Sequence, residues 1–165
     1  MNNNTFYFFR HGETFYSKNN VPYGDDVHLA SILPEGIPAI KRLASKLAEF
    51  PIESGYSSTY HRVLETVEIV NEQLDIPFTK DHRLDEMNVN ESIEDVGKRV
   101  QSFLEDPKVL AHNHIAVCTH GAALAAAKHL IQTGVFTPYD LPDYPKPGVL
   151  WVFEGTKLTE YSFRD

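Results

Sequence analysis

The sequence predicts an α/β fold in which helices cover both faces of a mostly parallel central sheet, a three-layer α/β/α sandwich. Apolar strands alternate with helical stretches along the chain, which is the pattern of such folds. The runs at 6–9 and 115–118 also lack the polar alternation of a half-exposed strand, so both are expected to be buried on two faces. Each run leads into a His-Gly pair, at the end of the strand where open α/β sheets bind ligands.

Size and composition limit the possible classes of protein. The chain has 165 residues, of which 42% are hydrophobic and 12% aromatic, enough for a single domain, 1–165, with a substantial core. The net charge of −8 disfavours attraction to nucleic acid or to an anionic membrane. No apolar run approaches the ~20 residues that span a bilayer. Cys118 is the only cysteine and Met1–Asn4 does not resemble a signal peptide, so we expect a cytoplasmic protein with no nucleic-acid or membrane partner.

The first half of the chain contains two predicted helices. Phe15–Ile32 is rich in Asn, Gly, Asp and Pro and is expected to be a loop on the active face. Apolar residues at helical spacing predict helices over 37–48 and 63–74. Glu53–Ser57 is too short to identify as a strand by itself, and Phe78–Leu84 is expected to be extended.

The second half continues the alternation. Ser92 is expected to cap a helix that ends before Asp106-Pro107. An Ala-rich helix, 122–131, follows the second His-Gly pair, and a Pro-rich loop comes after it. The last two apolar stretches, joined around Glu154-Gly155-Thr156, predict a terminal hairpin.

Histidine and arginine side chains follow three of the expected strands. Arg10 and His11 come directly after the first, where Gly12 allows a sharp turn, and His120-Gly121 repeats this design. The stretch Tyr56–Arg62 supplies a second Arg after a short strand. An always-charged guanidinium beside an imidazole at the carboxyl end of a strand is typical of a phosphate pocket.

This combination resembles the histidine phosphatase superfamily, also called the phosphoglycerate mutase-like family. The Arg-His-Gly-Glu signature of the family is similar to Arg10–Glu13, its second Arg to Arg62, and its second His-Gly to His120-Gly121. The resemblance covers nearly the whole chain in order. It implies a phosphoglycerate mutase-like fold and an enzyme that acts on phosphomonoesters.

The resemblance also implies a role for each of these side chains. The neutral imidazole of His11 would attack phosphorus and carry the phosphoryl group, while its other ring nitrogen donates to a fixed acceptor. Arg10 and Arg62 would hold the non-bridging oxygens, and His120 would donate to charge that develops in the transition state. Such a reaction uses no metal and no cofactor.

The proton donor is less sharply defined. Leu84-Asp85-Glu86 is similar to the Leu-x-Glu segment that supplies the acid in many members, so Glu86 is expected to have a raised pKa. Asp85 and Glu91 stay open as alternatives.

Three further residues complete the expected substrate site. Ser17 stands where many relatives place an Asn that touches the phosphate, and Ser58 or a backbone amide near it could donate as well. Gly121 is the third. Glu13 is expected to play a structural part, pairing with an Arg or capping backbone amides. The rim is expected to include the side chains Phe15, Tyr16, Tyr23 and the loop Tyr139–Tyr144.

A metal site is not predicted. His112 and His114 form a His-x-His pair, but no acidic residue or Cys accompanies them at ligand spacing. Solvated residues before a strand are the favoured interpretation.

The chain lacks a segment that mutases and longer phosphatases of the family carry after Leu-x-Glu. Met87–Asn90 leads almost directly into Glu91–Asp95, which resembles the Glu-Ser-x-Glu-Asp that follows the insertion elsewhere. We therefore expect a wide-open pocket, and a phosphatase rather than a mutase.

The sequence thus favours a metal-independent phosphatase acting through a phosphohistidine on His11. Two alternatives stay open. One is a phosphohistidine phosphatase with a protein substrate, and the other is a non-catalytic relative that binds a phosphorylated ligand. The expected partner is a phosphorylated small molecule or a phosphoprotein.

Overall fold

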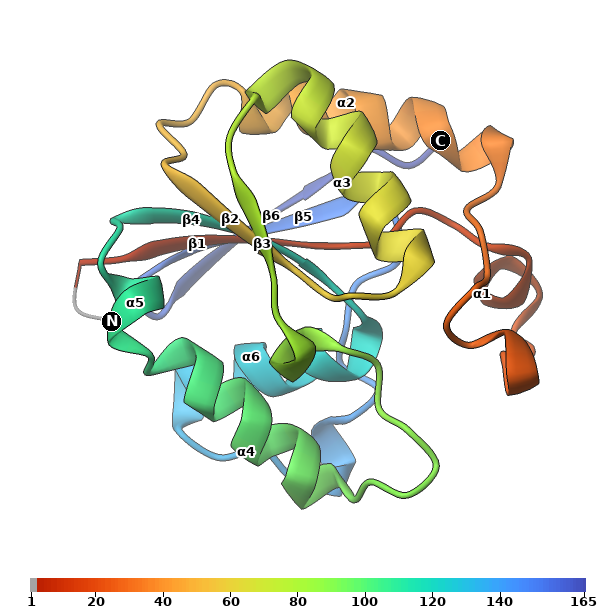
Figure 1. Ribbon diagram of the computed structural model, residues 1–165. Helices are drawn as coiled ribbons and strands as arrows, with labels where there is room; N and C mark the ends of the chain where they lie inside the picture. The colour runs from red at the N-terminus through yellow and green to blue at the C-terminus, as the bar shows by residue number, and fades with distance from the viewer. Residues whose placement is uncertain (1–2) are drawn as a thin grey trace.

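The computed structural model describes residues 3–165, with a six-stranded sheet in the middle and helices on both of its faces (Figure 1). The strand order is β3-β2-β4-β1-β5-β6. The strands are β1 (Thr5–Arg10), β2 (Ser54–Ser57), β3 (Phe78–Lys80), β4 (His114–Thr119), β5 (Val149–Glu154) and β6 (Lys157–Ser162). The helices are α1 (Phe15–Asn19), α2 (Ile37–Leu47), α3 (His61–Leu74), α4 (Ile93–Leu104), α5 (Pro107–Leu110) and α6 (Gly121–Thr133).

The sheet is mixed but mostly parallel. Strands β3, β2, β4 and β1 run parallel to one another, and the hairpin β5–β6 adds two antiparallel strands beside β1. Helices α2 and α3 lie on one face, and α4, α5 and α6 lie on the other (Figure 1). Arg10 is paired with Thr119, so the two strands that precede the His-Gly pairs end side by side. The predicted three-layer α/β fold is confirmed.

The side chains of β1 divide between two cores. Phe6 and Phe8 pack into the cluster that contains the α4 and α6 side chains, whereas Tyr7 and Phe9 pack into the cluster under α2 and α3. All four are at most 2% exposed, which explains why this strand shows no polar alternation. Cys118 of β4 is buried in the second cluster, and this burial raises the pKa of its thiol well above the usual value.

Most predicted elements are present, and the differences have local causes. Ser92 caps α4 through a capping box with Asp95, as expected. The segment predicted as an irregular loop, 15–32, instead contains α1, which begins with a capping box between Thr14 and Ser17. The segment 78–84 is extended only as far as Lys80. A 3-10 turn follows, because the Asp81 side chain accepts from the Arg83 amide at 2.9 Å.

None of the helices within residues 3–165 has both the length and the apolar character needed to cross a membrane.

Candidate active site

The carboxyl ends of the parallel strands bring the predicted residues together. His11 follows β1, His120 follows β4, and Arg62 lies in the first turn of α3 after β2. All three side chains are fully buried, and the two imidazole rings are 5.3 Å apart between centroids. The Glu86 atom Oε2 lies 3.8 Å from Nη2 of Arg62 and 3.9 Å from Nδ1 of His120.

The position of the proton on His11 follows from its one hydrogen bond. Its Nδ1 atom lies 2.8 Å from the carbonyl oxygen of Gly12. Since a carbonyl only accepts, Nδ1 carries the proton and the neutral ring keeps a lone pair on Nε2. Burial, followed by the charges of Arg10 and Arg62, holds the pKa of His11 well below 6.5. The fixed acceptor expected from the sequence is therefore the carbonyl of the next residue.

Most of the unpartnered buried polar atoms lie at this site. Among the described residues, six buried side-chain nitrogen or oxygen atoms have no hydrogen-bond partner, and one of them, Ser54 Oγ, belongs to β2. The other five are Nε of Arg10, Nε2 of His11, Nε and Nη2 of Arg62, and Nδ1 of His120. Leaving a buried polar group unpaired destabilises the fold by about 1–3 kcal/mol, so a cluster of five such atoms is typical of a site that binds a polar ligand. Three of the five atoms belong to guanidinium groups, so an anion fits this cluster.

The Arg62 guanidinium is held so that its edge stays free. Its Nη1 donates to the carbonyl of Val27, and the Tyr23 ring lies 4.0 Å from its central carbon. A face-on aromatic contact leaves the in-plane Nε and Nη2 for a ligand. The Thr66 hydroxyl accepts from the Gly12 amide and donates to the Arg62 carbonyl, both at 2.8 Å. This hydroxyl ties the turn after β1 to α3.

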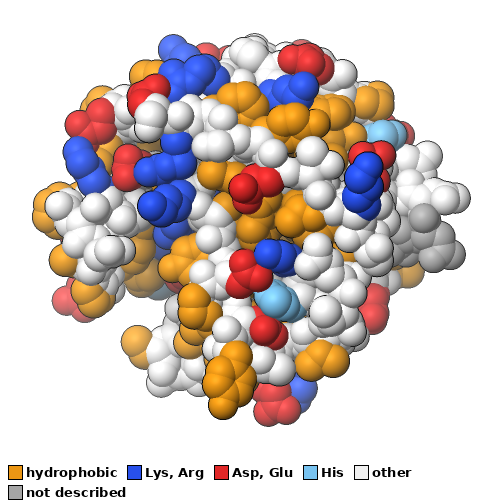
Figure 2. Space-filling view, turned by 180° about the vertical axis from the view of Figure 1, so that it is seen from behind, with side chains coloured by type: hydrophobic (Ala, Val, Ile, Leu, Met, Phe, Trp, Pro, Cys, Tyr) orange, Lys and Arg blue, Asp and Glu red, His pale blue; other side chains and the backbone are white. Residues whose placement is uncertain are grey.

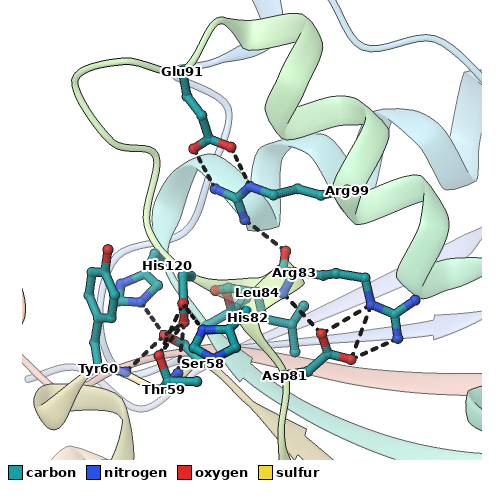
Figure 3. A network of polar contacts seen from close by, with 12 residues as sticks. Ser58, Thr59, Tyr60, Asp81, His82, Arg83, Leu84, Glu91, Arg99 and His120 are labelled. Atoms are coloured by element: carbon teal, nitrogen blue, oxygen red, sulfur yellow. Dashed lines mark hydrogen bonds and ion pairs between the residues drawn. The ribbon is translucent and has the colours of Figure 1, made fainter.

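Of the three carboxylates that could supply a proton, Glu86 is the one beside His120 and Arg62. Burial is the main cause that raises its pKa. Glu91 instead pairs with Arg99 at 2.6 Å, which lowers the pKa of Glu91 (Figure 3). Asp85 accepts hydrogen bonds from Ser58 and Thr59. The geometry therefore favours Glu86 over both alternatives.

The three residues predicted to bind substrate, Ser17, Ser58 and Gly121, have different surroundings in the structure. The Ser58 hydroxyl is committed to protein partners, with Nε2 of His120 at 2.8 Å and Oδ1 of Asp85 at 2.9 Å. Ser17 lies on the wall of a cavity, but its hydroxyl accepts from the Thr14 amide at 2.9 Å. Gly121 begins α6, where a Cβ atom would lie only 2.7 Å from the Tyr144 ring. A side chain at 121 would therefore displace Tyr144.

A cavity of about 590 Å³ leads to the site. Figure 2 shows a hollow on this side of the molecule, with Lys and Arg side chains gathered beside it. The cavity is lined by Arg10, Glu13, Tyr16, Ser17, Lys18, Asn20, Val21, Pro22, Tyr23, Glu86, Pro142, Tyr144, Lys146, Pro147 and Arg164. Tyr16, Tyr23 and Tyr144 are thus on the rim as expected, whereas Phe15 and Tyr139 point to solvent.

The expectation of a wide-open pocket was wrong. No regular element stands between the turn ending at Leu84 and α4, so a cap is absent there. However, the segment 15–30 covers the site from another direction, through Tyr23 and the Val27 carbonyl on Arg62. His11, Arg62 and His120 consequently lie behind the cavity wall.

Some contacts were not foreseen from the sequence. Lys146 and Arg164 come from the Pro-rich loop and the last residues of the chain, where no periodic pattern marks a site. The Glu13 side chain forms neither an ion pair nor a hydrogen bond among residues 3–165, contrary to the expected pairing with an Arg or capping of backbone amides, and it lines the cavity instead.

The His-x-His pair does not form part of the site. Nδ1 of His114 lies 2.8 Å from the Tyr7 hydroxyl, and His112 is near Glu53. Within the described part of the chain, no group of three or more His, Cys, Asp or Glu side chains is arranged to hold a metal ion.

The sequence matches a known protein family. Residues 6–91 match the family model described as the histidine phosphatase superfamily (branch 1). The matched stretch includes Arg10, His11, Arg62 and Glu86, whereas His120 follows it. The sequence search finds no significant match among curated proteins.

Several solved structures have the same fold. Bacillus stearothermophilus YhfR is 23% identical, with 94% of both chains covered and a TM-score of 0.78. A putative alpha-ribazole-5'-P phosphatase from Escherichia coli K-12 is 15% identical over 98% of this chain and 96% of that one, with a TM-score of 0.79. A phosphoglycerate mutase from Bacillus anthracis is 15% identical over 98% and 93%, with a TM-score of 0.72.

At these identities the solved structures establish the fold alone, and the family assignment comes from the sequence model. Because that model matches more than half of the chain, the protein belongs to branch 1 of the histidine phosphatase superfamily.

Proposed function

We propose that this protein hydrolyses phosphomonoesters of small molecules through a phosphohistidine on His11, without a metal or another cofactor. The observation that carries this proposal is the convergence of five unpartnered buried nitrogen atoms from Arg10, His11, Arg62 and His120. A phosphoryl group has anionic oxygens for the guanidinium donors and an electrophilic phosphorus for the one nitrogen that holds a free lone pair.

In the first half of the reaction, Arg10 and Arg62 donate hydrogen bonds to the phosphoryl oxygens. The lone pair of Nε2 of His11 forms a bond to phosphorus while the bond from phosphorus to the leaving oxygen breaks. The leaving oxygen takes a proton from the Glu86 carboxyl group, whose raised pKa keeps that proton available. The alcohol departs, and Glu86 is left ionised.

In the second half, water attacks the phosphorus of the phosphohistidine. The Glu86 carboxylate takes a proton from that water, which restores the acid for the next cycle. The bond between phosphorus and Nε2 breaks, and its electron pair returns to the nitrogen. Inorganic phosphate leaves, and neutral His11 is regenerated with the proton on Nδ1, which still donates to the Gly12 carbonyl.

The covered site favours a small substrate. Arg10 and Glu86 line a cavity of about 590 Å³ and His11 lies behind its wall, an arrangement that suits an organic phosphate better than a folded phosphoprotein. Lys146 and Arg164 on its wall favour a leaving group that carries an anionic substituent. Water is the proposed acceptor, since the described segment between Leu84 and α4 has no regular element that could hold a phosphoglycerate during a transfer between two of its hydroxyls.

The experiment that tests this function traps the intermediate. Brief mixing with a ³²P-labelled phosphomonoester, followed by quenching, should leave label on the protein that is stable in alkali and labile in acid, as expected of a phosphohistidine. A His11→Gln variant should carry no label and show no turnover, while a His112→Gln variant should behave as the wild type. Full activity in His11→Gln would refute the mechanism, and preferential turnover of a phosphohistidine protein would refute the proposed substrate class.

A further inference from the structure

Asp85, Ser58 and His120 form a chain of hydrogen bonds beside the proposed site. Figure 3 shows the side chains of Ser58 and His120. The Ser58 hydroxyl lies 2.9 Å from Oδ1 of Asp85 and 2.8 Å from Nε2 of His120. Ser58 and His120 are fully buried. The Asp85 carboxylate is fixed from its other side by the amide of Thr59 at 2.8 Å and the hydroxyl of Thr59 at 2.9 Å.

The donors and acceptors in this chain can be assigned completely. An ionised carboxylate only accepts, so the Ser58 hydroxyl donates its single proton to Asp85. The Ser58 oxygen then has only acceptor capacity left, so it accepts from His120, whose Nε2 must carry the proton. Nδ1 of His120, which lies 3.9 Å from Oε2 of Glu86, is consequently the nitrogen that lacks a partner.

We propose that Asp85 is a positioning residue that acts through the Ser58 hydroxyl. Asp85 keeps one His120 proton on Nε2, reserves Nδ1 for the phosphoryl group, and stabilises the imidazolium that forms when a dianionic ester arrives. This inference rests on the proposed function, because it assumes a phosphoryl group between the two histidines.

The charges around His120 explain why such a counter-charge is needed. Burial, the neighbouring His11, and then the cations Arg62, Arg10 and Arg99 all hold the pKa of His120 well below 6.5. The carboxyl groups on the other side are Glu86, which keeps its proton until the leaving oxygen takes it, and, through Ser58, Asp85. The Tyr60 ring, 5.1 Å away, packs edge-on against the imidazole and adds no charge at neutral pH.

Without a proton, Nδ1 would present a lone pair to phosphoryl oxygens, which is repulsive. When the dianion binds, His120 takes a proton from solvent on Nδ1 and becomes a donor to those oxygens. The Asp85 charge, relayed by the Ser58 hydroxyl, favours this second proton.

Two variants separate the charge from the hydrogen bond. Asp85→Asn removes the charge, but its amide oxygen can still accept from Ser58 and from the Thr59 amide, so the fold is retained. Ser58→Ala removes the acceptor of the Nε2 proton. His82→Ala is the matched control: His82 is largely exposed and contacts only the outer oxygen of Asp85, at 3.0 Å.

The first readout is the pH profile of kcat on p-nitrophenyl phosphate, whose leaving group needs no acid. The basic limb then reports the loss of the His120 proton in the complex. We expect this limb to move to lower pH by about one unit in Asp85→Asn, with kcat at neutral pH lowered about tenfold to hundredfold. His82→Ala should keep the wild-type limb. A purely structural role for Asp85 would lower kcat without moving the limb, and that result would overturn the proposal.

The second readout does not depend on activity, so it stays informative if the proposed function fails. Ring ¹⁵N chemical shifts of the free enzyme, assigned by comparison with His120→Gln, should show the His120 proton on Nε2. In Ser58→Ala, a fraction of the molecules should carry the His120 proton on Nδ1 instead. Saturating inorganic phosphate should protonate both nitrogens in the wild type, and less completely in Asp85→Asn at the same pH. A proton on Nδ1 in the free wild type, or equal protonation in both proteins with phosphate, would refute the relay.

Discussion

The carboxyl group of Glu86 lies 3.8 Å from the Arg62 guanidinium, yet burial raises its pKa instead of the cation lowering it. At this separation, the loss of solvent raises the pKa of Glu86 more than the Arg62 cation lowers it. The charge of that cation is also shared with the Val27 carbonyl and the Tyr23 ring. Glu86 is therefore suited to hold a proton near the leaving oxygen.

Replacing Glu86 by Gln should affect substrates according to the basicity of their leaving groups. General acid catalysis is worth about 10²–10⁴ in rate when an alkoxide must leave, and little when a nitrophenolate leaves. We expect kcat/KM of Glu86→Gln to fall by that factor for alkyl phosphates and only a few-fold for p-nitrophenyl phosphate. Steady-state kinetics on both esters provide the measurement.

The stability of Glu86→Gln shows whether a loss of activity in this variant comes from misfolding. Because the folded pKa of Glu86 is raised, its contribution to stability is full below the unfolded pKa of about 4.5 and is lost as the pH rises. Glu86→Gln should therefore be at least as stable as the wild type at neutral pH in urea unfolding. Equal losses of activity on both esters would show that Glu86 positions the site and is not the acid.

Stability should decline in mild acid because of the buried histidines. The folded pKa of His11 lies well below the unfolded value of 6.5, so the unfolded chain binds more protons once the pH falls below 6.5. The contribution of neutral His11 to the free energy of unfolding is complete above pH 6.5 and is lost as the pH falls towards the folded pKa. Each such buried histidine lowers the free energy of unfolding by up to about 1.4 kcal/mol per pH unit. Urea unfolding at about pH 7.5 and about pH 5.5 should show a smaller loss in His11→Gln than in the wild type. An identical loss in the two proteins would contradict the burial of a neutral His11, and His112→Gln, which changes a half-exposed residue outside the site, serves as the control.

The Tyr23 ring should influence substrate binding through Arg62. The ring lies over the guanidinium, 4.0 Å from its central carbon, and such cation–π contacts are worth about 0.5–2 kcal/mol. We expect Tyr23→Leu to raise KM about 3- to 30-fold with a smaller change in kcat. Tyr23→Phe keeps the ring and loses only the hydroxyl contact with Thr14, so its KM should stay near that of the wild type. Equal effects of the two variants would assign the role to the hydroxyl instead.

Phosphoglycerate should be hydrolysed slowly or not at all, and it should not be isomerised. The segment between Leu84 and α4 has no element that could hold the glycerate while the phosphoryl group moves between its oxygens. Phosphorus NMR of a reaction with 3-phosphoglycerate distinguishes inorganic phosphate from the 2-phospho isomer. Isomer formation faster than phosphate release would show that the missing insertion is not required for transfer.

The sequence predicted those parts of the fold that short-range patterns determine. The buried strands β1 and β4, the Ser92 cap of α4 and the terminal hairpin each depend on residues close together in the chain. The positions of Arg10, His11 and His120 could be inferred as well, because parallel strands align their carboxyl ends. The roles of Arg10, His11, Arg62, His120 and Glu86 in a reaction are still predictions.

Contacts between irregular segments could not be predicted. The ring of Tyr23 over Arg62, and the hydrogen bond from Ser58 to Asp85, join residues 39 and 27 positions apart with no periodic signal at either end. The covering role of the segment 15–30 was missed for the same reason. Its composition indicates turns, but not the direction in which the turns fold.

The only thiol of this protein, that of Cys118, should be unreactive. Cys118 lies two residues before His120, yet it is buried in the core under α2 and α3, and its raised pKa leaves almost no thiolate at neutral pH. Peroxide and alkylating reagents act on accessible thiolates, and an imidazole nucleophile such as the one proposed for His11 offers them no comparable target. The proposed dephosphorylation should therefore continue under oxidative stress that inactivates phosphatases with a catalytic cysteine.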